Sequence, residues 1–220
     1  MIIDLHVHTS YFSSDSALEF PAVIEQARKS GIDGICIAEH GRFWDVDELA
    51  EISRKYDFPL FPSCEVRTDD GHVLVLGLHK YVTWMWLIGK LRQMVDVAGG
   101  VMILAHPLRR KYFPGKTVED MVGDFRNDPA YQYVDIVETV NGRVADEENR
   151  ISKEMAGRLG LRGVGGSDAH SMEDIPSGAT EFERDIHSLD EMITELKAGR
   201  FRAVDLRQKR YKFLNPVGFD

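Results

Sequence analysis

Two histidines separated by a single residue follow an apolar start at the N-terminus. Met1-Ile2-Ile3 leads directly into Asp4-Leu5-His6-Val7-His8-Thr9, and this start predicts a β-strand. Side chains at positions i and i+2 of a strand point to the same side, so both imidazoles would face one point. Histidine is a common ligand of Zn, Fe and Mn-type ions. The pair therefore indicates either a metal site or two histidines on a solvated strand face.

Other apolar segments also end in residues that can bind a metal. They lead to His40, Glu65, His106 and Asp168, and Glu138 follows a further apolar segment in the same way. Chance would place one or two such residues at strand ends, but five or six are hard to explain as surface decoration. In α/β barrels the active site gathers at the carboxyl ends of the strands. An open doubly wound sheet uses only one or two strand ends at its switch point. The spread of these residues therefore favours a closed barrel.

The elements that would position these residues alternate between strand and helix. This alternation predicts a mostly parallel sheet with helical crossovers, in one α/β domain over residues 1–220. Glycines after several of the helices mark their ends. The predicted helices are Ala17–Ser30, Asp47–Tyr56, Trp84–Ala98, Thr117–Phe125, Ala145–Leu159 and Ser188–Ala198.

The number of candidate ligands indicates more than one metal ion. A catalytic metal with an open position takes about three protein ligands, so nine candidates suit two or three ions. Mixed nitrogen and oxygen ligands fit Zn, Mn and Fe alike. The candidates are His6, His8, Asp15, His40, Glu65, His72, His106, Asp168 and His170.

Composition narrows the possible classes of partner. The 220 residues carry a net charge of −9 and are 43% hydrophobic, which allows one sizeable core but does not favour binding to long nucleic acids. The longest apolar patch, Tyr81 to Ile88, is too short to span a bilayer. Cys36 and Cys64 lie in apolar runs, and we expect them to be reduced in a cytoplasmic protein. No feature of the sequence indicates an oligomeric state.

Five segments in this order resemble the motifs of the PHP (polymerase and histidinol phosphatase) superfamily. They are Asp4-Leu5-His6-Val7-His8-Thr9, Ala38-Glu39-His40, Cys64-Glu65-Val66 with Gly71-His72, Ala105-His106-Pro107, and Ser167-Asp168-Ala169-His170. The resemblance covers residues 1 to about 180, and it implies a distorted (β/α)7 barrel. Glu39 stands where the family more usually has Asp, at a position that is not expected to be a ligand.

The resemblance also implies a trinuclear site. His6 and His8 would hold a first metal with Glu65 and Asp168, and Glu65 would bridge to a second metal. The remaining ligands would be His72 and His106 for the second metal, and Asp15, His40 and His170 for the third. Many family members carry His where this chain has Asp15.

Cationic and polar residues beyond the ligands are candidates for substrate binding. Arg109 and Arg110 follow His106-Pro107 closely, and arginine suits bidentate contacts with a phosphate. Asn141 and Arg143 follow a strand end and could also reach substrate. The alternative for each is a solvated loop, a loop cap or a salt bridge.

We therefore expect a hydrolase that cleaves a small phosphomonoester, such as a sugar, nucleotide or amino-alcohol phosphate. A hydroxide held between metals would attack phosphorus, with Glu65 as the bridging carboxylate. The leaving alkoxide would be neutralised by a metal or protonated through Asp168, His170 or a water.

Three alternatives remain open at the level of the sequence. A nuclease or nucleotide (bis)phosphate phosphatase would need a groove with basic and aromatic groups. A metal-dependent amidohydrolase would typically need a carbamylated Lys or a lone Asp base, and no predicted strand ends in Lys. A non-catalytic domain stabilised by its metals would be expected to have lost ligands, and none is missing here.

Overall fold

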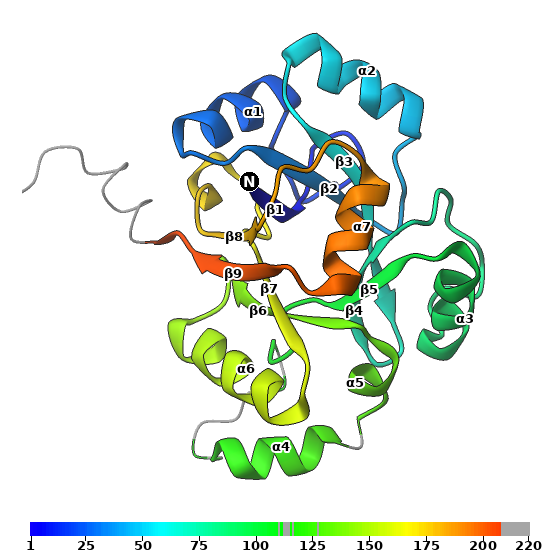
Figure 1. The fold of residues 1–220 in the computed structure, drawn as a ribbon, viewed down its shortest axis with the longest axis vertical. Helices are drawn as coiled ribbons and strands as arrows, with labels where there is room; N and C mark the ends of the chain where they lie inside the picture. Colours follow the sequence, from blue (N-terminus) through cyan, green and yellow to red (C-terminus); the bar gives the residue numbers. More distant parts are fainter. Residues whose placement is uncertain (110, 112–114, 116, 127, 208–220) are drawn as a thin grey trace, which may run out of the picture.

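The computed structural model describes residues 1–109, 111, 115, 117–126 and 128–207 (Figure 1). Within these ranges one sheet contains nine strands, in the order β7-β6-β5-β4-β3-β2-β1-β8-β9. The strands are β1 Ile2–Val7, β2 Gly34–His40, β3 Leu60–Thr68, β4 Gly71–Leu76, β5 Val101–Leu104, β6 Ile136–Asn141, β7 Arg162–Gly166, β8 Gly178–Phe182 and β9 Phe201–Asp205. The helices are α1 Phe20–Lys29, α2 Val46–Tyr56, α3 Ile88–Ala98, α4 Val118–Arg126, α5 Pro129–Tyr133, α6 Asp146–Leu159 and α7 Leu189–Ala198.

The sheet closes into a distorted barrel through the segment that follows β7. Val7 at the end of β1 pairs in parallel with Ala169. The Ala169 carbonyl accepts from the His8 amide at 3.0 Å, and the Ala169 amide donates to the His6 carbonyl at 3.3 Å. The other half of β1 pairs with β8, which continues the sheet to β9. The predicted mixed α/β fold, a distorted barrel of the PHP type, is confirmed.

One strand breaks the parallel order, and this reversal matters for the site. β1, β2 and β3 run parallel, as do β5, β6 and β7. β4 runs antiparallel to both β3 and β5, its neighbours in the sheet. The start of β4 therefore lies at the same end of the barrel as the carboxyl ends of the parallel strands. A tight turn at Asp69-Asp70 makes this reversal possible.

Helices cover the outside of the sheet (Figure 1). In the figure α1 and α2 lie beside β1 to β3, and α3 lies beside β5. Buried apolar side chains such as Val23 of α1, Leu91 of α3 and Met155 of α6 pack these helices against the strands. Cys36 and Cys64 are free and buried, as predicted. Among the described residues no helix is long and apolar enough to cross a membrane.

The local predictions differ from the structure mainly at helix starts and in short elements. The helix predicted from Trp84 begins at Ile88, because a carboxylate oxygen of Asp69 accepts from the Ile88 amide at 2.9 Å and so marks its first turn. The helix predicted from Ala17 begins at Phe20, with a proline in its first turn. The short elements α5 and β8 were not predicted, because five residues show too little periodicity to identify.

Candidate metal centre

The carboxyl ends of the strands bring the predicted ligands together at one mouth of the barrel. His6 lies near the end of β1, His40 ends β2, and Glu65 lies in β3. His72 lies at the start of β4, and it reaches the same mouth because β4 runs in the opposite direction. The other ligands follow strand ends or sit in the loop after β1. They are His8 and Asp15 after β1, His106 after β5, and Asp168 and His170 after β7.

Glu65 lies at the centre of this group. Its Oε1 accepts from His72 Nδ1 and from His106 Nε2, each at 2.9 Å, and its Oε2 accepts from His40 Nδ1 at 2.8 Å. Burial alone would raise the pKa of Glu65, but hydrogen bonds from His106, His40 and His72 and the nearby ring of His6 outweigh burial and hold that pKa well below its usual value. Glu65 is therefore an anion that faces imidazoles on two sides, as a bridging carboxylate would.

Two fully buried imidazole nitrogens beside Glu65 have no hydrogen-bond partner. They are Nε2 of His6 and Nε2 of His8. Each lies 3.6 Å from Oδ1 of Asp168, and they lie 3.7 and 3.6 Å from the carboxylate oxygens of Glu65. These distances are too long for hydrogen bonds. Four ligands held 2.0–2.2 Å from one ion at tetrahedral angles would lie about 3.3–3.6 Å apart. The donor set therefore fits a divalent cation.

Hydrogen bonds at the opposite ring nitrogens orient three of the histidines. His6 Nδ1 donates to Glu138 Oε1 at 3.0 Å, His8 Nδ1 lies 3.4 Å from Ser13 Oγ, and His170 Nδ1 donates to the Asp168 carbonyl at 2.8 Å. A histidine that donates from Nδ1 presents the lone pair of Nε2, and partners of this kind are typical of metal-binding histidines. Burial lowers the pKa of His8 to about 4, so its ring is neutral near pH 7.

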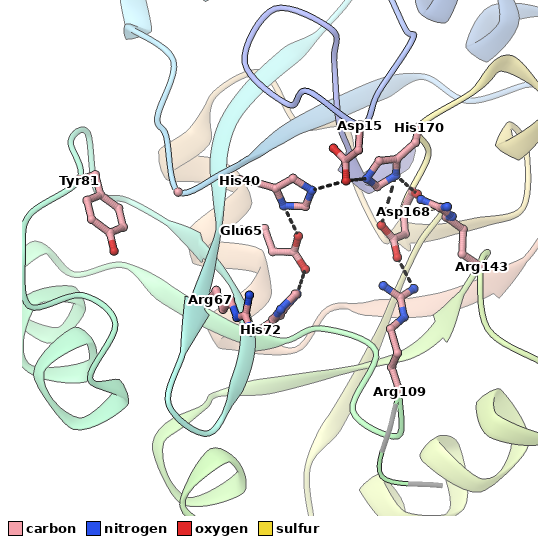
Figure 2. A pocket seen from close by; sticks show the side chains of 11 residues that line it. Asp15, His40, Glu65, Arg67, His72, Tyr81, Arg109, Arg143, Asp168 and His170 are labelled. Atoms are coloured by element: carbon pink, nitrogen blue, oxygen red, sulfur yellow. Dashed lines mark hydrogen bonds and ion pairs between the residues drawn. The ribbon is translucent and has the colours of Figure 1, made fainter.

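A third group lies beside the first. Figure 2 shows His40 and His170 both pointing at Asp15, with Nε2–Oδ2 distances of 3.3 and 3.4 Å. The side chain of Asp15 is 59% exposed, so this group faces the solvent more than the others do. Ring nitrogens of His8, His40 and His170 also lie within 4.8 Å of one another. The structure thus brings all nine predicted ligands together, and it adds His8 as a neighbour of the third group.

The backbone is strained at two of these residues. His106 has φ = 30° and Asp168 has φ = 56°, both in the left-handed region that non-glycine residues rarely adopt. Strained conformations of this kind persist where the surroundings over-determine them, commonly at functional sites. At His106 the amide donates to Glu138 Oε2 at 2.7 Å, which ties the strained residue to the partner of His6.

A cavity of about 690 Å³ opens over the group and is lined by cationic side chains. Arg109 donates to Asp168 Oδ2, and Arg143 lines the cavity near His170 (Figure 2). Arg67 and Tyr81 line it as well, on the side of Glu65 away from Arg143 (Figure 2). Neither was predicted. Arg67 lies two residues after Glu65 on the same strand, which is a usable signal, but the sequence around Tyr81 holds none.

The predicted substrate-binding residue Asn141 lies elsewhere. Asn141 is fully buried and does not line the cavity. Its amide nitrogen donates to Glu138 at 2.9 Å and to Asp168 at 3.3 Å, and its oxygen accepts from the Arg143 amide at 2.9 Å. Asn141 is thus placed to orient Glu138 and Asp168 by hydrogen bonds, not to contact substrate. Arg110 lies outside the described residues.

The sequence of this chain matches the models of two known protein-family domains. The model of the PHP domain matches residues 4–113, which carry seven of the nine candidate ligands, and the PHP-associated model matches residues 146–201. The chain belongs to the PHP domain family. The two matches together contain the carboxyl ends of β1, β2, β3, β5 and β7.

Individual known proteins share either sequence or fold with this chain. A "Probable histidinol-phosphatase" from Thermotoga maritima is 32% identical over 97 residues, which are 36% of this chain and 40% of that protein. Among solved structures, PsfC from Pseudomonas syringae PB-5123 aligns with a TM-score of 0.63 at 15% identity, over 99% of this chain and 98% of its own. A candidate metal-dependent phosphoesterase from Bifidobacterium adolescentis aligns with a TM-score of 0.57 at 18% identity, over 88% and 95%. The two structures show a shared fold.

Proposed function

We propose that this PHP-family protein is a metal-dependent phosphoesterase that hydrolyses a small phosphomonoester. One observation carries the proposal: a buried set of nitrogen and oxygen ligands converges at the base of a cavity whose wall holds three arginines. The names of the Thermotoga and Bifidobacterium relatives agree with this class of reaction. The chain covers only 40% of the Thermotoga protein, so its substrate is not carried over.

Two or three divalent ions, of Zn, Mn or Fe, would be held by the nine ligands. His6, His8 and Asp168 would take one ion, Glu65 would bridge to an ion beside His72 and His106, and a third would lie between Asp15, His40 and His170. When bound, such ions supply Lewis acidity and lower the pKa of a water molecule toward neutrality. The mixture of imidazole and carboxylate donors suits all three metals.

Arginines would hold the phosphoryl group. Arg109 is anchored to Asp168 at the edge of the ligand group, so its remaining N–H groups can meet a phosphate that enters the cavity. Arg143 approaches from the opposite side to Arg67 (Figure 2). A guanidinium provides planar, bidentate donors for phosphate oxygens. Together these residues offset the charge that grows on the non-bridging oxygens during hydrolysis.

The proton for the leaving oxygen would come from His170 or a water. Burial would raise the pKa of Asp168, but the nearby charge of His6, together with the ring of His8 and the charge of Arg109, outweighs burial and holds that pKa well below its usual value. Asp168 is therefore an anion and an unsuitable acid. In His170, Nδ1 donates to the Asp168 carbonyl, while Nε2 faces Asp15 Oδ2 at 3.4 Å. That nitrogen can ligate a third ion or carry the proton, but it cannot do both.

A nuclease is the less favoured alternative. A second cavity of about 760 Å³ adjoins the first and shares Arg67, His72 and Arg109 with it, so a longer substrate would have room. Its wall, however, includes the acidic side chains of Asp69, Asp70, Asp124 and Asp128. Carboxylates at that position repel a polyanionic strand. The charge of the adjoining cavity therefore favours a small monoester over an oligonucleotide.

A substrate panel tests the proposal. Metal-free protein would be reloaded with Mn or Zn and assayed on phosphomonoesters, a generic phosphodiester, and an amide and a lactone. We expect turnover of at least one monoester, its loss in His8→Ala, and its retention in the matched control His187→Ala, which removes an exposed histidine outside the site. Turnover of the diester without the monoesters would replace the proposal with the nuclease. Turnover of the amide or lactone alone would indicate hydrolysis at carbon.

A further inference from the structure

Glu39 is a fully buried carboxylate directly before the ligand His40, and neither metal ligation nor substrate contact uses it. Its Oε1 accepts from the indole N–H of Trp44 at 3.1 Å and from the Thr9 hydroxyl. Its Oε2 accepts from the Thr9 amide at 3.2 Å and from the Ser13 hydroxyl. The indole and the amide can only donate, and one of them faces each oxygen. Both oxygens of Glu39 therefore act as acceptors.

Ser13 connects this carboxylate to the ligand His8. A hydroxyl has one hydrogen and two acceptor positions. The hydrogen of Ser13 is donated to Glu39, and the His40 amide donates to Ser13 Oγ at 3.3 Å. The second acceptor position faces His8 Nδ1 at 3.4 Å. Because Ser13 has no other hydrogen to give, His8 Nδ1 must carry the hydrogen in this contact.

His8 differs from its neighbours in what its Nδ1 meets. Nδ1 of His6 faces a carboxylate oxygen of Glu138, and Nδ1 of His170 faces a backbone carbonyl. Neither of those groups can donate when the carboxylate is ionised, so the tautomers of His6 and His170 are fixed by direct contact. A hydroxyl can donate or accept, so Ser13 alone would leave the tautomer of His8 open. The direction of the Ser13 hydroxyl depends on Glu39.

We propose that Glu39 is a positioning residue that acts through Ser13 to fix His8 as the tautomer with the hydrogen on Nδ1. Nε2 of His8 then carries the lone pair and faces Asp168 and Glu65, so it would serve as a ligand when a cation binds there. This role rests on the metal-dependent function proposed above and extends it to residues that touch neither metal nor substrate. It accounts for the carboxyl group of Glu39, which is buried beneath the loop that carries Asp15.

The test reads the tautomer directly in metal-free protein labelled with ¹⁵N at histidine. Long-range ¹H–¹⁵N correlations distinguish a protonated ring nitrogen from one with a lone pair. In the wild type we expect the hydrogen of His8 on Nδ1, and a hydrogen on Nε2 would overturn the proposal without any variant. This readout needs neither metal nor turnover, so it stands even if no phosphatase activity is found.

Variants then test the relay. Ser13→Ala and Glu39→Gln are each expected to mix or reverse the His8 tautomer and to weaken Mn²⁺ binding about 10- to 100-fold, as for other partners of metal-binding histidines. The Gln amide places a donor where Glu39 had only acceptors. Thr9→Val is the matched control: it also removes one hydroxyl donor to Glu39 but leaves the Ser13–His8 contact. If all three variants leave the tautomer unchanged, or Thr9→Val changes it as much as Ser13→Ala does, the relay is refuted.

Discussion

Arg109 and Asp168 form an ion pair at the edge of the proposed metal centre. The two carboxylate oxygens of Asp168 have different neighbours. Oδ2 accepts from Arg109, while Oδ1 lies 3.6 Å from the Nε2 atoms of both His6 and His8. One side chain thus places a cationic clamp next to the position where a cation fits.

Removing the guanidinium of Arg109 should lower catalytic efficiency without loss of bound metal. For Arg109→Met we expect kcat/KM for the preferred monoester to fall about 100- to 1,000-fold, because a charged donor to the transition state is lost. Bound metal should stay at the wild-type level, since Asp168 keeps its charge. Steady-state kinetics and metal analysis check both points. Arg184→Met, which removes an arginine paired with Glu191, is the control. An unchanged kcat/KM would remove Arg109 from the site.

Metal removal should destabilise the fold. The unpartnered Nε2 atoms of His6 and His8 gain ligation when an ion binds, so the ion stabilises the folded state by about 2.7 kcal/mol at 100 times Kd. For a chain of this size such a change raises Tm by roughly 5–10 °C. Differential scanning calorimetry with and without Mn²⁺ measures the shift. His8→Ala should abolish most of it, and a wild-type Tm that does not respond to Mn²⁺ would contradict the expectation.

Metal binding should release protons near pH 7. Burial would lower the pKa of His6, but the charges of Glu138 and Asp168 raise it well above 6.5. The hydrogen bond to Glu65 likewise raises the pKa of His40. Both rings therefore take up an additional proton more readily than a free imidazole does, and a ring that carries it must lose it to ligate. Metal affinity should therefore increase as pH rises from 6.5, through the raised pKa values.

Calorimetry in buffers of different ionisation enthalpy counts the released protons. The same raised pKa values have the opposite effect on the metal-free fold: their contribution to stability is complete below pH 6.5 and is lost as pH rises through them. Metal-free and metal-loaded protein should thus show different slopes of stability against pH above 6.5. Binding without proton release, and with no dependence of affinity on pH, would rule out protonated His6 and His40.

Glu138 should influence the metal through His6. In Glu138→Gln an amide group replaces the carboxylate that accepts from His6 Nδ1, the His106 amide and Asn141. One of these donors would then face an N–H group. We expect affinity for Mn²⁺ to fall about 10- to 100-fold, measured by competition with a chromogenic chelator. Glu195→Gln, at a buried carboxylate that pairs with Arg200, should retain the wild-type affinity.

The convergence of the candidate ligands was predictable because it depends on strand ends, which sequence patterns identify well. His40, Glu65 and Asp168 each follow or end an apolar run, and the closure of the barrel brings those ends together. His72 was included as a histidine at the start of a predicted strand, and the family motif Gly71-His72 agreed with it. The structure supplies the physical reason, which is that β4 runs antiparallel and starts at the mouth.

Residues whose role depends on the path of a loop were not predictable in the same way. Asn141 also stands at a strand end, yet it lies beneath the ligands, where Glu138 and Asp168 use its amide. Spacing does not distinguish that position from the cavity wall. Tyr81 reaches the cavity through the loop between β4 and α3, which carries no periodic pattern. Ser13 and Glu39 became connected only through side-chain hydrogen bonds across 26 residues of sequence.

The most direct measurement is turnover of a phosphomonoester against the number of bound ions. Metal-free protein would be titrated with Mn²⁺ or Zn²⁺, and phosphate release and bound metal would be determined on the same samples. The account predicts no turnover without metal, turnover that rises as two or three ions bind, and no turnover in His8→Ala at any metal concentration. Protein that holds two or more ions and releases no phosphate from any monoester, or that keeps full turnover when stripped of metal, would contradict it.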